Sequence, residues 1–417
     1  MIFYAIVHFM MERKGFRVGW IAGLQGVGWC ALLGALFWVK PFLTLIGFGM
    51  LLWRSRHPSR AAMSVFVVFC LIYLGLINVT KIPVDDEILY LSLLMDARHL
   101  DAYHPSALWV REPVYGLWIF GLSRLSLINQ AGFVLISTCF GYLPFLLALA
   151  LLSRQLRLSR RTTLALHVLV LFFPQLFSLS AHLMRQFPAL SLLMLHFGGV
   201  ITRWRALQVS GGLAIATHVM IIPLWILSYV KKDPKRPIHS LVRLGAFFLV
   251  LYLGVLYLAP HLQSVPVLGD VFIRLLRGDQ GINPGPIKLF ECLLTLALLL
   301  LSACLFLDKK SLPGDFNEGP LHLTILAVAI LVLYSMQDPN LLDRARRYYL
   351  SFYFLAPMLL PGLIVRYPAL GIPIRSAPLL SIPYFFYKIE TGVWQYAPVQ
   401  ELLLGSCFRI FALSPLH

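Results

Sequence analysis

Charged residues are scarce in this sequence. They make up 13% of the 417 residues, and no polar stretch is long enough to form a separate soluble domain. No Walker loop, HExxH, GxSxG or CxxC motif occurs. The missing Walker loop removes the usual signature of nucleotide binding. The missing CxxC pairs leave the six scattered cysteines without the spacing of a disulfide framework or a zinc site.

Apolar residues are abundant instead. They make up 59% of the chain and recur in runs of the roughly 20 residues that cross a bilayer as a helix. We therefore expect an all-α fold, a polytopic transmembrane helical bundle with about 11–14 membrane segments, some of them half-helices. With no polar block to separate domains, residues 1–417 are predicted to form a single transmembrane domain.

Positive charge is in excess, with 35 lysines and arginines against 18 acidic residues and a net charge of +17. Much of this excess lies in short loops, which indicates cytoplasmic loops rather than nucleic-acid binding. The alternation of apolar runs and cationic clusters then places three segments outside the membrane, at about residues 81–129, 260–286 and 337–348.

One apolar run contradicts this alternation. Residues 206–230 are flanked by cationic clusters on both sides, so a single crossing would put one cluster outside. Two short half-helices that dip in and return, with a bend between His218 and Pro223, would resolve the conflict if they line an aqueous cavity. The bend would bring His218 close to Arg185. The alternative is one continuous helix whose histidine bonds a neighbouring backbone group.

Arginines in the predicted external regions point to an anionic ligand. Arg185 opens an apolar helix, where a cation at the bilayer centre costs roughly 2.5–3.5 kcal/mol unless something offsets it. Guanidinium groups bind phosphate bidentately, so Arg185 together with Arg344, Arg346 and Arg347 could hold a diphosphate. For the last three, ion pairs with nearby aspartates or contact with lipid headgroups is the alternative.

Candidate general bases are also present in the first external segment. Asp85, Asp86 and Glu112 are expected close to helix ends, at the depth where the head of a lipid-linked substrate would lie. Each could instead be a helix cap or a solvated charge. His218 could act as the base or as a phosphate ligand, and His182 is a weaker rival. Proline after Glu112 predicts a short helix over residues 114–122.

Several short motifs resemble those of a known family. In order, they are Asp85-Asp86 followed by Tyr90, Glu112-Pro113, Arg185-Gln186-x-x-Ala189, Ala214-x-x-x-His218 before Pro223, and the arginine-rich Arg344 to Tyr348. Over about Asp85 to Pro361 the chain resembles the EpsG/Wzy-type bacterial polysaccharide polymerases. It departs from that pattern at Pro188, within the arginine motif, and in its N-terminal extension.

The resemblance implies a GT-C-type membrane glycosyltransferase with no cofactor and no metal. Such an enzyme transfers a glycan from undecaprenyl diphosphate to another lipid-linked repeat unit, at the outer face of the bacterial inner membrane. It implies that Arg185 and the cluster Arg344 to Arg347 neutralise the leaving diphosphate, that His218 lines the same cavity, and that Glu112 or Asp85 and Asp86 handle the acceptor hydroxyl. The implied partners are lipid-linked glycans, the bilayer and a chain-length regulator.

Two other functions stay open at this stage. A GT-C transferase could use a polyprenyl-phosphate sugar as donor and add single sugars to a lipid-linked acceptor. A transporter of lipid-linked glycans is the second alternative, although transporters often carry internal repeats and the sequence shows none.

Overall fold

Every element in the described part of the chain is helical. The computed structural model describes residues 31–55, 58–84, 86–99, 112–125, 128–218, 221–229, 289–308, 312, 316–335 and 348–416, with isolated helical positions at 239, 242, 246 and 257. These residues include 18 helices, which confirms the all-α prediction. The predicted external segment 260–286, and 337–347 of the third segment, lie outside the described residues.

Two described helices are long and apolar enough to cross a membrane, α4 (Arg60–Val79) and α8 (Gln130–Gln155). A third candidate is the pair α9 (Arg160–Leu171) and α10 (Pro174–His182), which bend by 53° at their junction. The apolar residues 164–179 predict one outward crossing, and they form this bent pair rather than one straight helix. Pro174 has no N–H to continue α9 and instead occupies the first turn of α10.

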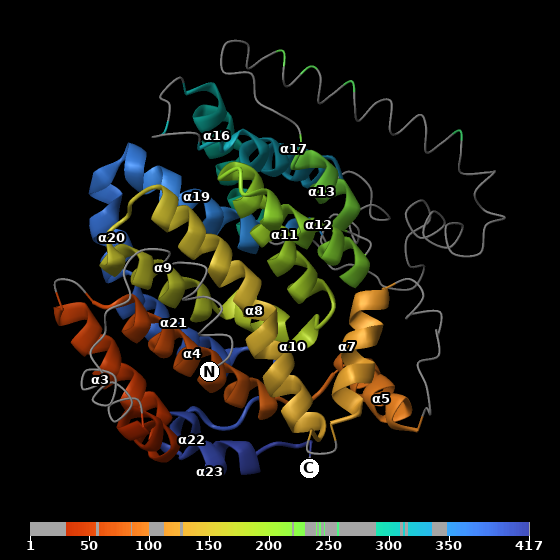
Figure 1. Cartoon of the computed structure of the whole chain (residues 1–417), viewed down its shortest axis with the longest axis vertical. Helices are drawn as coiled ribbons and strands as arrows, with labels where there is room; N and C mark the ends of the chain where they lie inside the picture. Colours follow the sequence, from red (N-terminus) through yellow and green to blue (C-terminus); the bar gives the residue numbers. More distant parts are fainter. Residues whose placement is uncertain are drawn as a thin grey trace.

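Helix α8 lies at the centre of the bundle (Figure 1), where it packs against α4, α9, α10, α19 (Phe352–Arg366) and α11 (Gln186–Ile201). Gly141 of α8 lets the Phe187 ring approach, because a Cβ there would lie 2.9 Å from Cδ1 of that ring. Pro144 interrupts the hydrogen bonding of α8, and the next backbone N–H, that of Phe145, donates to Ser191 Oγ over 2.9 Å.

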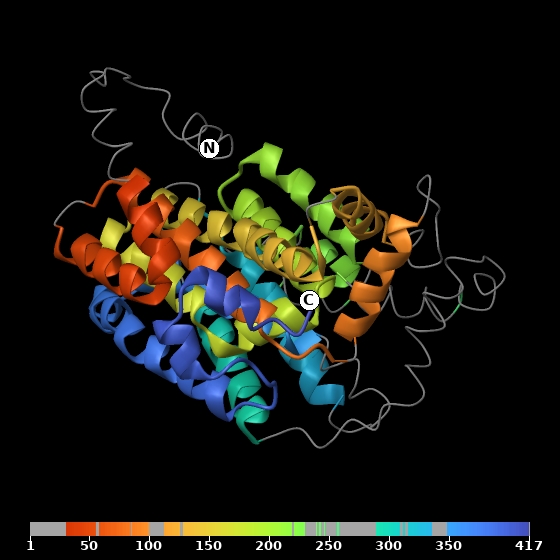
Figure 2. The ribbon, with the colours of Figure 1, turned by 90° about the horizontal axis from the view of Figure 1, so that it is seen from below.

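A smaller core lies at one end of the bundle (Figure 2). It is formed by α5 (Asp86–Arg98) and α7 (Pro113–Ser123), which pack against each other and against the adjoining ends of α4 and α8. Helix α7 starts at Pro113, as predicted from the sequence. Its neighbour on the other side is α12 (Arg205–Thr217).

The run of residues 206–230 is broken where the sequence predicted. Helix α12 ends at Thr217, His218 is extended with φ −158° and ψ 113°, and α13 (Ile222–Leu227) begins with a proline in its first turn. His196 of α11 connects the two pieces, because its ring nitrogens contact the carbonyl of Gln208 at 2.9 Å and Ser228 Oγ at 2.7 Å. Both short helices are therefore attached to α11.

The remaining helices cover the two ends and one side of the bundle. Helix α16 (Leu289–Leu307) packs on α17 (Gly319–Ser335), and the backbone N–H of Asn317 bonds the carbonyl of Ile201, at the last residue of α11. The others are α3 (Pro41–Arg54), the 3-10 helix η2 (Pro368–Leu370), α20 (Gly371–Ser376), α21 (Pro378–Thr391), α22 (Val399–Leu404) and α23 (Cys407–Ala412).

The loop between α21 and α22 lies at the same end as α5. The backbone N–H of Ile82 donates to the carbonyl of Gln395 over 2.9 Å, and that of Ala397 donates to Thr80 Oγ1 over 3.2 Å. The segment from Gln395 to Ala397 therefore passes beside the end of α4 that leads to α5.

Candidate functional site

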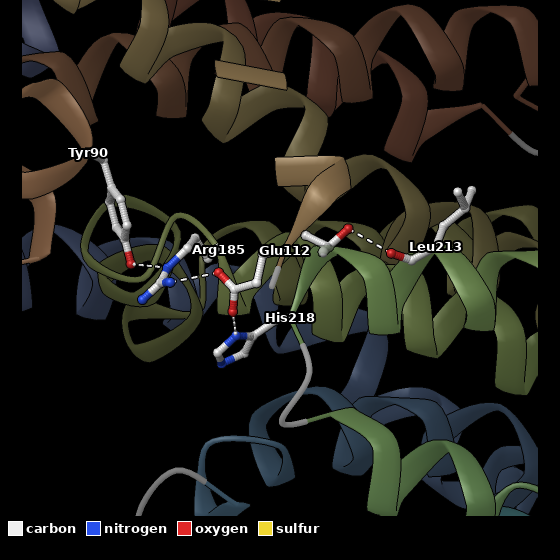
Figure 3. A network of polar contacts seen from close by, with 6 residues as sticks. Tyr90, Glu112, Arg185, Leu213 and His218 are labelled. Carbon is white, nitrogen blue, oxygen red and sulfur yellow. Dashed lines mark hydrogen bonds and ion pairs between the residues drawn. The ribbon is translucent and has the colours of Figure 1, made fainter. Parts of the chain in front are cut away.

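Three predicted site residues from distant parts of the chain meet at one point (Figure 3). Arg185 Nη1 donates to Glu112 Oε2 over 2.6 Å, and His218 Nδ1 lies 2.5 Å from Glu112 Oε1. Arg185 Nε also donates to the hydroxyl of Tyr90 over 3.0 Å. We call these four residues the Glu112 cluster. The predicted proximity of His218 to Arg185 is confirmed.

Each charged member stands where a helix begins or ends. Glu112 precedes Pro113, and the proline ring disfavours the helical conformation for the residue before it, so Glu112 has φ −131°. Arg185 directly precedes α11, and His218 follows the last residue of α12. A cation at the start of α11 opposes the helix dipole, and Glu112 compensates this unfavourable placement.

Burial makes the pairing necessary. The side chains of Glu112, His218 and Arg185 are 5%, 11% and 20% exposed, and buried charges are stable only when paired and hydrogen-bonded. The charge of Arg185 is thus offset by a buried carboxylate.

The pKa values follow from this environment. Burial opposes ionisation of Glu112, but the hydrogen bonds and charges of His218 and Arg185 outweigh it and hold its pKa below the ordinary value. Burial also opposes the charge of Arg185, yet Tyr90 and Glu112 raise the pKa of the guanidinium. Burial raises the pKa of Tyr90 to about 12. At neutral pH the cluster therefore holds a carboxylate, a guanidinium and a neutral phenol.

The cluster retains hydrogen-bonding capacity. A guanidinium has five N–H donors, and the described residues accept two of those of Arg185. When Nδ1 of His218 donates to the carboxylate, Nε2 carries the lone pair that can accept a proton. The buried hydroxyl of Tyr115, whose ring centroid is 5.5 Å from that of Tyr90, has no hydrogen-bond partner among the described residues. The arrangement can therefore bind an anion beside an oriented base.

The other predicted residues have different outcomes. Asp86 lies in the first turn of α5, one turn before Tyr90, and its charge adds to the effect of burial on the pKa of that phenol. His182 is not in the cluster; its ring lies 4.6 Å from that of Trp394. Four predicted residues lie outside the described part of the chain, namely Asp85, Arg344, Arg346 and Arg347.

Sequence reasoning did not identify two features. Tyr90 was noted as a residue of the membrane boundary and of a family motif, but no pattern linked it to Arg185.

A second cluster was missed: Glu318 Oε2 accepts from Arg366 Nη1 at 2.5 Å and lies 3.2 Å from His322 Nε2, while Arg366 Nε is 3.8 Å from Asp308 Oδ2. The spacing of Glu318 and His322, one helical turn apart, was its only signal. We call these four residues the Glu318 cluster.

In the described ranges, no group of three or more histidine, cysteine, aspartate or glutamate side chains is arranged to hold a metal ion. Comparison of the chain with known protein families, characterised proteins and solved structures finds no match.

Proposed function

We propose that the protein is a membrane glycosyltransferase that polymerises oligosaccharide repeat units carried on undecaprenyl diphosphate. The Arg185 end of α11 would face the outside of a bacterial cytoplasmic membrane, in a bundle of about 11–14 membrane segments. The observation that carries this proposal is the Glu112 cluster. It brings together a guanidinium, a carboxylate and an imidazole that the sequence had singled out as diphosphate ligand and base.

Arg185 would stabilise the leaving group. When the bond between the anomeric carbon and the diphosphate oxygen breaks, its electron pair stays on the diphosphate. Fixed cations in a site sheltered from water stabilise such developing charge most effectively. Tyr90 and Glu112 hold the guanidinium in place, and the N–H groups that no described residue engages would bind phosphate oxygens.

His218 is best placed to receive the acceptor's proton. Both oxygens of Glu112 are engaged, one by Arg185 and one by His218, so the carboxylate orients the imidazole and stabilises its charged form. As the acceptor hydroxyl oxygen bonds the anomeric carbon, its proton would pass to Nε2 of His218. Glu112 then acts as a positioning residue.

Further parts of the proposal concern Asp86 and four residues outside the described ranges. Arg344, Arg346 and Arg347 would add positive charge around the second phosphate, and Asp85 with Asp86 would contact the acceptor sugar. A chain-length regulator would be a protein partner, and neither a metal nor another cofactor would take part.

The test is reconstitution. Full-length protein in proteoliposomes would be given purified undecaprenyl-diphosphate repeat units, and the products would be separated by gel electrophoresis. A ladder of glycan lengths on lipid supports the proposal. Addition of single sugars from a polyprenyl-phosphate donor would instead show the smaller transferase activity. Movement of lipid-linked glycan without new glycosidic bonds would show that the protein is a transporter. Single-sugar addition or glycan movement would each overturn the proposal that the protein is a polymerase.

A further inference from the structure

A cavity of about 200 Å³ lies between α10 and the region where α21 ends. Its wall combines aromatic, amide, hydroxyl and amine side chains, among them Gln175, Phe177, Ser178, Lys388, Trp394 and Tyr396. None of these residues belongs to the Glu112 cluster. The cavity is at the same end of the bundle as that cluster, because the loop that carries Trp394 bonds Ile82 at the end of α4.

The polar wall has capacity for a ligand. The amide oxygen of Gln175 is buried and accepts no hydrogen bond from any described residue, and leaving a buried acceptor unpaired costs free energy. One turn further along α10, Ser178 Oγ donates to the carbonyl of Pro174 over 2.9 Å and interacts with the Tyr396 hydroxyl, so one lone pair of the serine oxygen remains as an acceptor. Both groups would be satisfied by a ligand that presents hydroxyl donors.

The aromatic wall is held in position. The Nζ of Lys81 lies 4.7 Å from the centre of the Trp394 ring, and the ring of His182 lies 4.6 Å from it. The ring of Tyr396 lies 5.6 Å from that of Phe177. Rigid aromatic surfaces provide large contact area, and in combination with a few hydrogen-bonding groups they form typical small-molecule sites.

We propose that this cavity is a carbohydrate subsite. A pyranose ring presents apolar C–H faces to an indole or phenol and hydroxyl groups to an amide and a serine, which matches the two walls of the cavity. That its occupant is a sugar of the glycan under elongation rests on the proposed function.

The position of the cavity bears on substrate size. It is connected to the catalytic cluster through contacts: Trp394 with Lys81, Lys81 Nζ with Glu87 Oε2 at 2.6 Å, and then one turn of α5 from Glu87 to Tyr90. A sugar in the cavity is thus removed from the bond-forming point by the width of several side chains. A single sugar cannot occupy both places at once, and an oligosaccharide would have to pass around these buried side chains to do so.

The experiment measures binding of a sugar that lacks phosphate. The probe is the repeat-unit oligosaccharide released by mild acid from the host's lipid-linked pool and labelled by borotritide reduction. Its affinity for the full-length protein in detergent is measured by equilibrium dialysis. We expect Trp394→Leu to weaken binding by about tenfold or more, Gln175→Leu to weaken it less, and Trp394→Phe to retain most of it. Trp204→Leu is the matched control, because Trp204 is 40% exposed at the Ile201 end of α11.

The outcomes separate this inference from the proposed function. Absence of binding by the wild type, or equal binding by Trp394→Leu, Gln175→Leu and the wild type, overturns the subsite even if the protein polymerises glycans. Binding that Trp394→Leu weakens supports the subsite even if no glycosidic bond is ever formed. Arg185→Ala should bind the reduced oligosaccharide as the wild type does. Elution volume and thermal midpoint of each variant establish that it is folded, and Trp394→Phe keeps the test informative if the leucine variant is not.

Discussion

Two similar clusters stand at opposite ends of α11. Each joins a buried glutamate to an arginine and a histidine, and the 16 residues of the helix separate them by about 24 Å. In the Glu112 cluster one carboxylate serves both Arg185 and His218. In the Glu318 cluster Arg366 faces two carboxylates, those of Glu318 and Asp308.

The two arginines differ in the exposure of their side chains and in their capacity to bind a further group. The side chain of Arg366 is 8% exposed and connects the start of α17 to the end of α19, as a structural ion pair does. The side chain of Arg185 is 20% exposed and, among the described residues, is held by a tyrosine and a single carboxylate. The combination of glutamate, arginine and histidine therefore does not identify a functional site. The charge balance of the Glu112 cluster, and the N–H donors of Arg185 that no described residue engages, favour a functional role there.

The largest expected effect comes from removing the two arginines in turn. Arg185→Ala should lower polymer formation per folded molecule by about 10³-fold, because it removes the cation aimed at the leaving group. Arg366→Ala should leave the buried carboxylate of Glu318 without its guanidinium partner and destabilise the fold by about 3–5 kcal/mol, with normal activity in the molecules that remain folded. Activity normalised to folded protein, measured by fluorescence-detected size exclusion, separates the two effects.

Arg185→Lys and Arg366→Lys refine this comparison. A lysine supplies the charge but not the planar fork, so Arg185→Lys should still lose most activity while remaining folded. Wild-type glycan lengths in Arg185→Ala, or an equal loss of specific activity in Arg366→Ala, would remove the distinction between the clusters.

Much of the geometry of the Glu112 cluster was predictable from local rules. The proline after Glu112 fixed the start of α7, and the two cationic clusters around residues 206–230 required a break, which is found at His218. Placing His218 at a bend and Arg185 at a helix start was enough to predict that they meet. These inferences succeeded because they rest on proline chemistry and on the cost of charge in an apolar run.

Long-range packing could not be predicted in the same way. The bond from Arg185 to Tyr90 spans 95 residues and depends on how α5 packs, which no local pattern specifies. The same holds for the pairing of Glu318 with Arg366 and for the loop that places Trp394 beside Lys81. The bend between α9 and α10 had a visible signal, Pro174, but the apolar run around it suggested a continuous helix.

A smaller effect is expected from neutralising each glutamate without changing its size. Glu112→Gln should reduce polymer formation by about 10²-fold, because the amide neither stabilises a protonated His218 nor balances Arg185. Glu318→Gln should lower the thermal midpoint and leave activity per folded molecule unchanged. Initial rates of ladder formation at saturating acceptor provide the measurement, and comparable rates for the two variants would contradict the assignment.

Acid should weaken both clusters through their glutamates. Interactions with histidine and arginine outweigh burial and keep the pKa of Glu112 and of Glu318 below 4.5. A lowered folded-state pKa gives stability that is fully present above the unfolded value and is lost as pH falls through the lowered value. The thermal midpoint should therefore fall below about pH 4.5, and Glu318→Gln should flatten that dependence.

Glu87 should make stability depend on pH in the opposite direction, so it serves as a control for the pH series. Burial raises its pKa against the opposing effect of Lys81, so the folded state holds its proton more tightly and gains stability as pH falls. Glu87→Gln should steepen the acid loss. A Glu318→Gln variant with the same pH dependence as the wild type would show that this carboxylate contributes nothing to acid sensitivity.

The smallest effect should come from a methyl group placed against the structural cluster. A Cβ at position 362 of α19 would lie 1.6 Å from Glu318 Oε1, so Gly362→Ala must displace the carboxylate from Arg366. We expect a loss of about 1–3 kcal/mol in stability with unchanged specific activity. Gly47→Ala in α3 is the matched control: a Cβ there meets nothing within 4 Å, and alanine should stabilise that helix by up to about 1 kcal/mol. Reduced specific activity in folded Gly362→Ala would show that the Glu318 cluster takes part in function and that leftover donors are the wrong criterion.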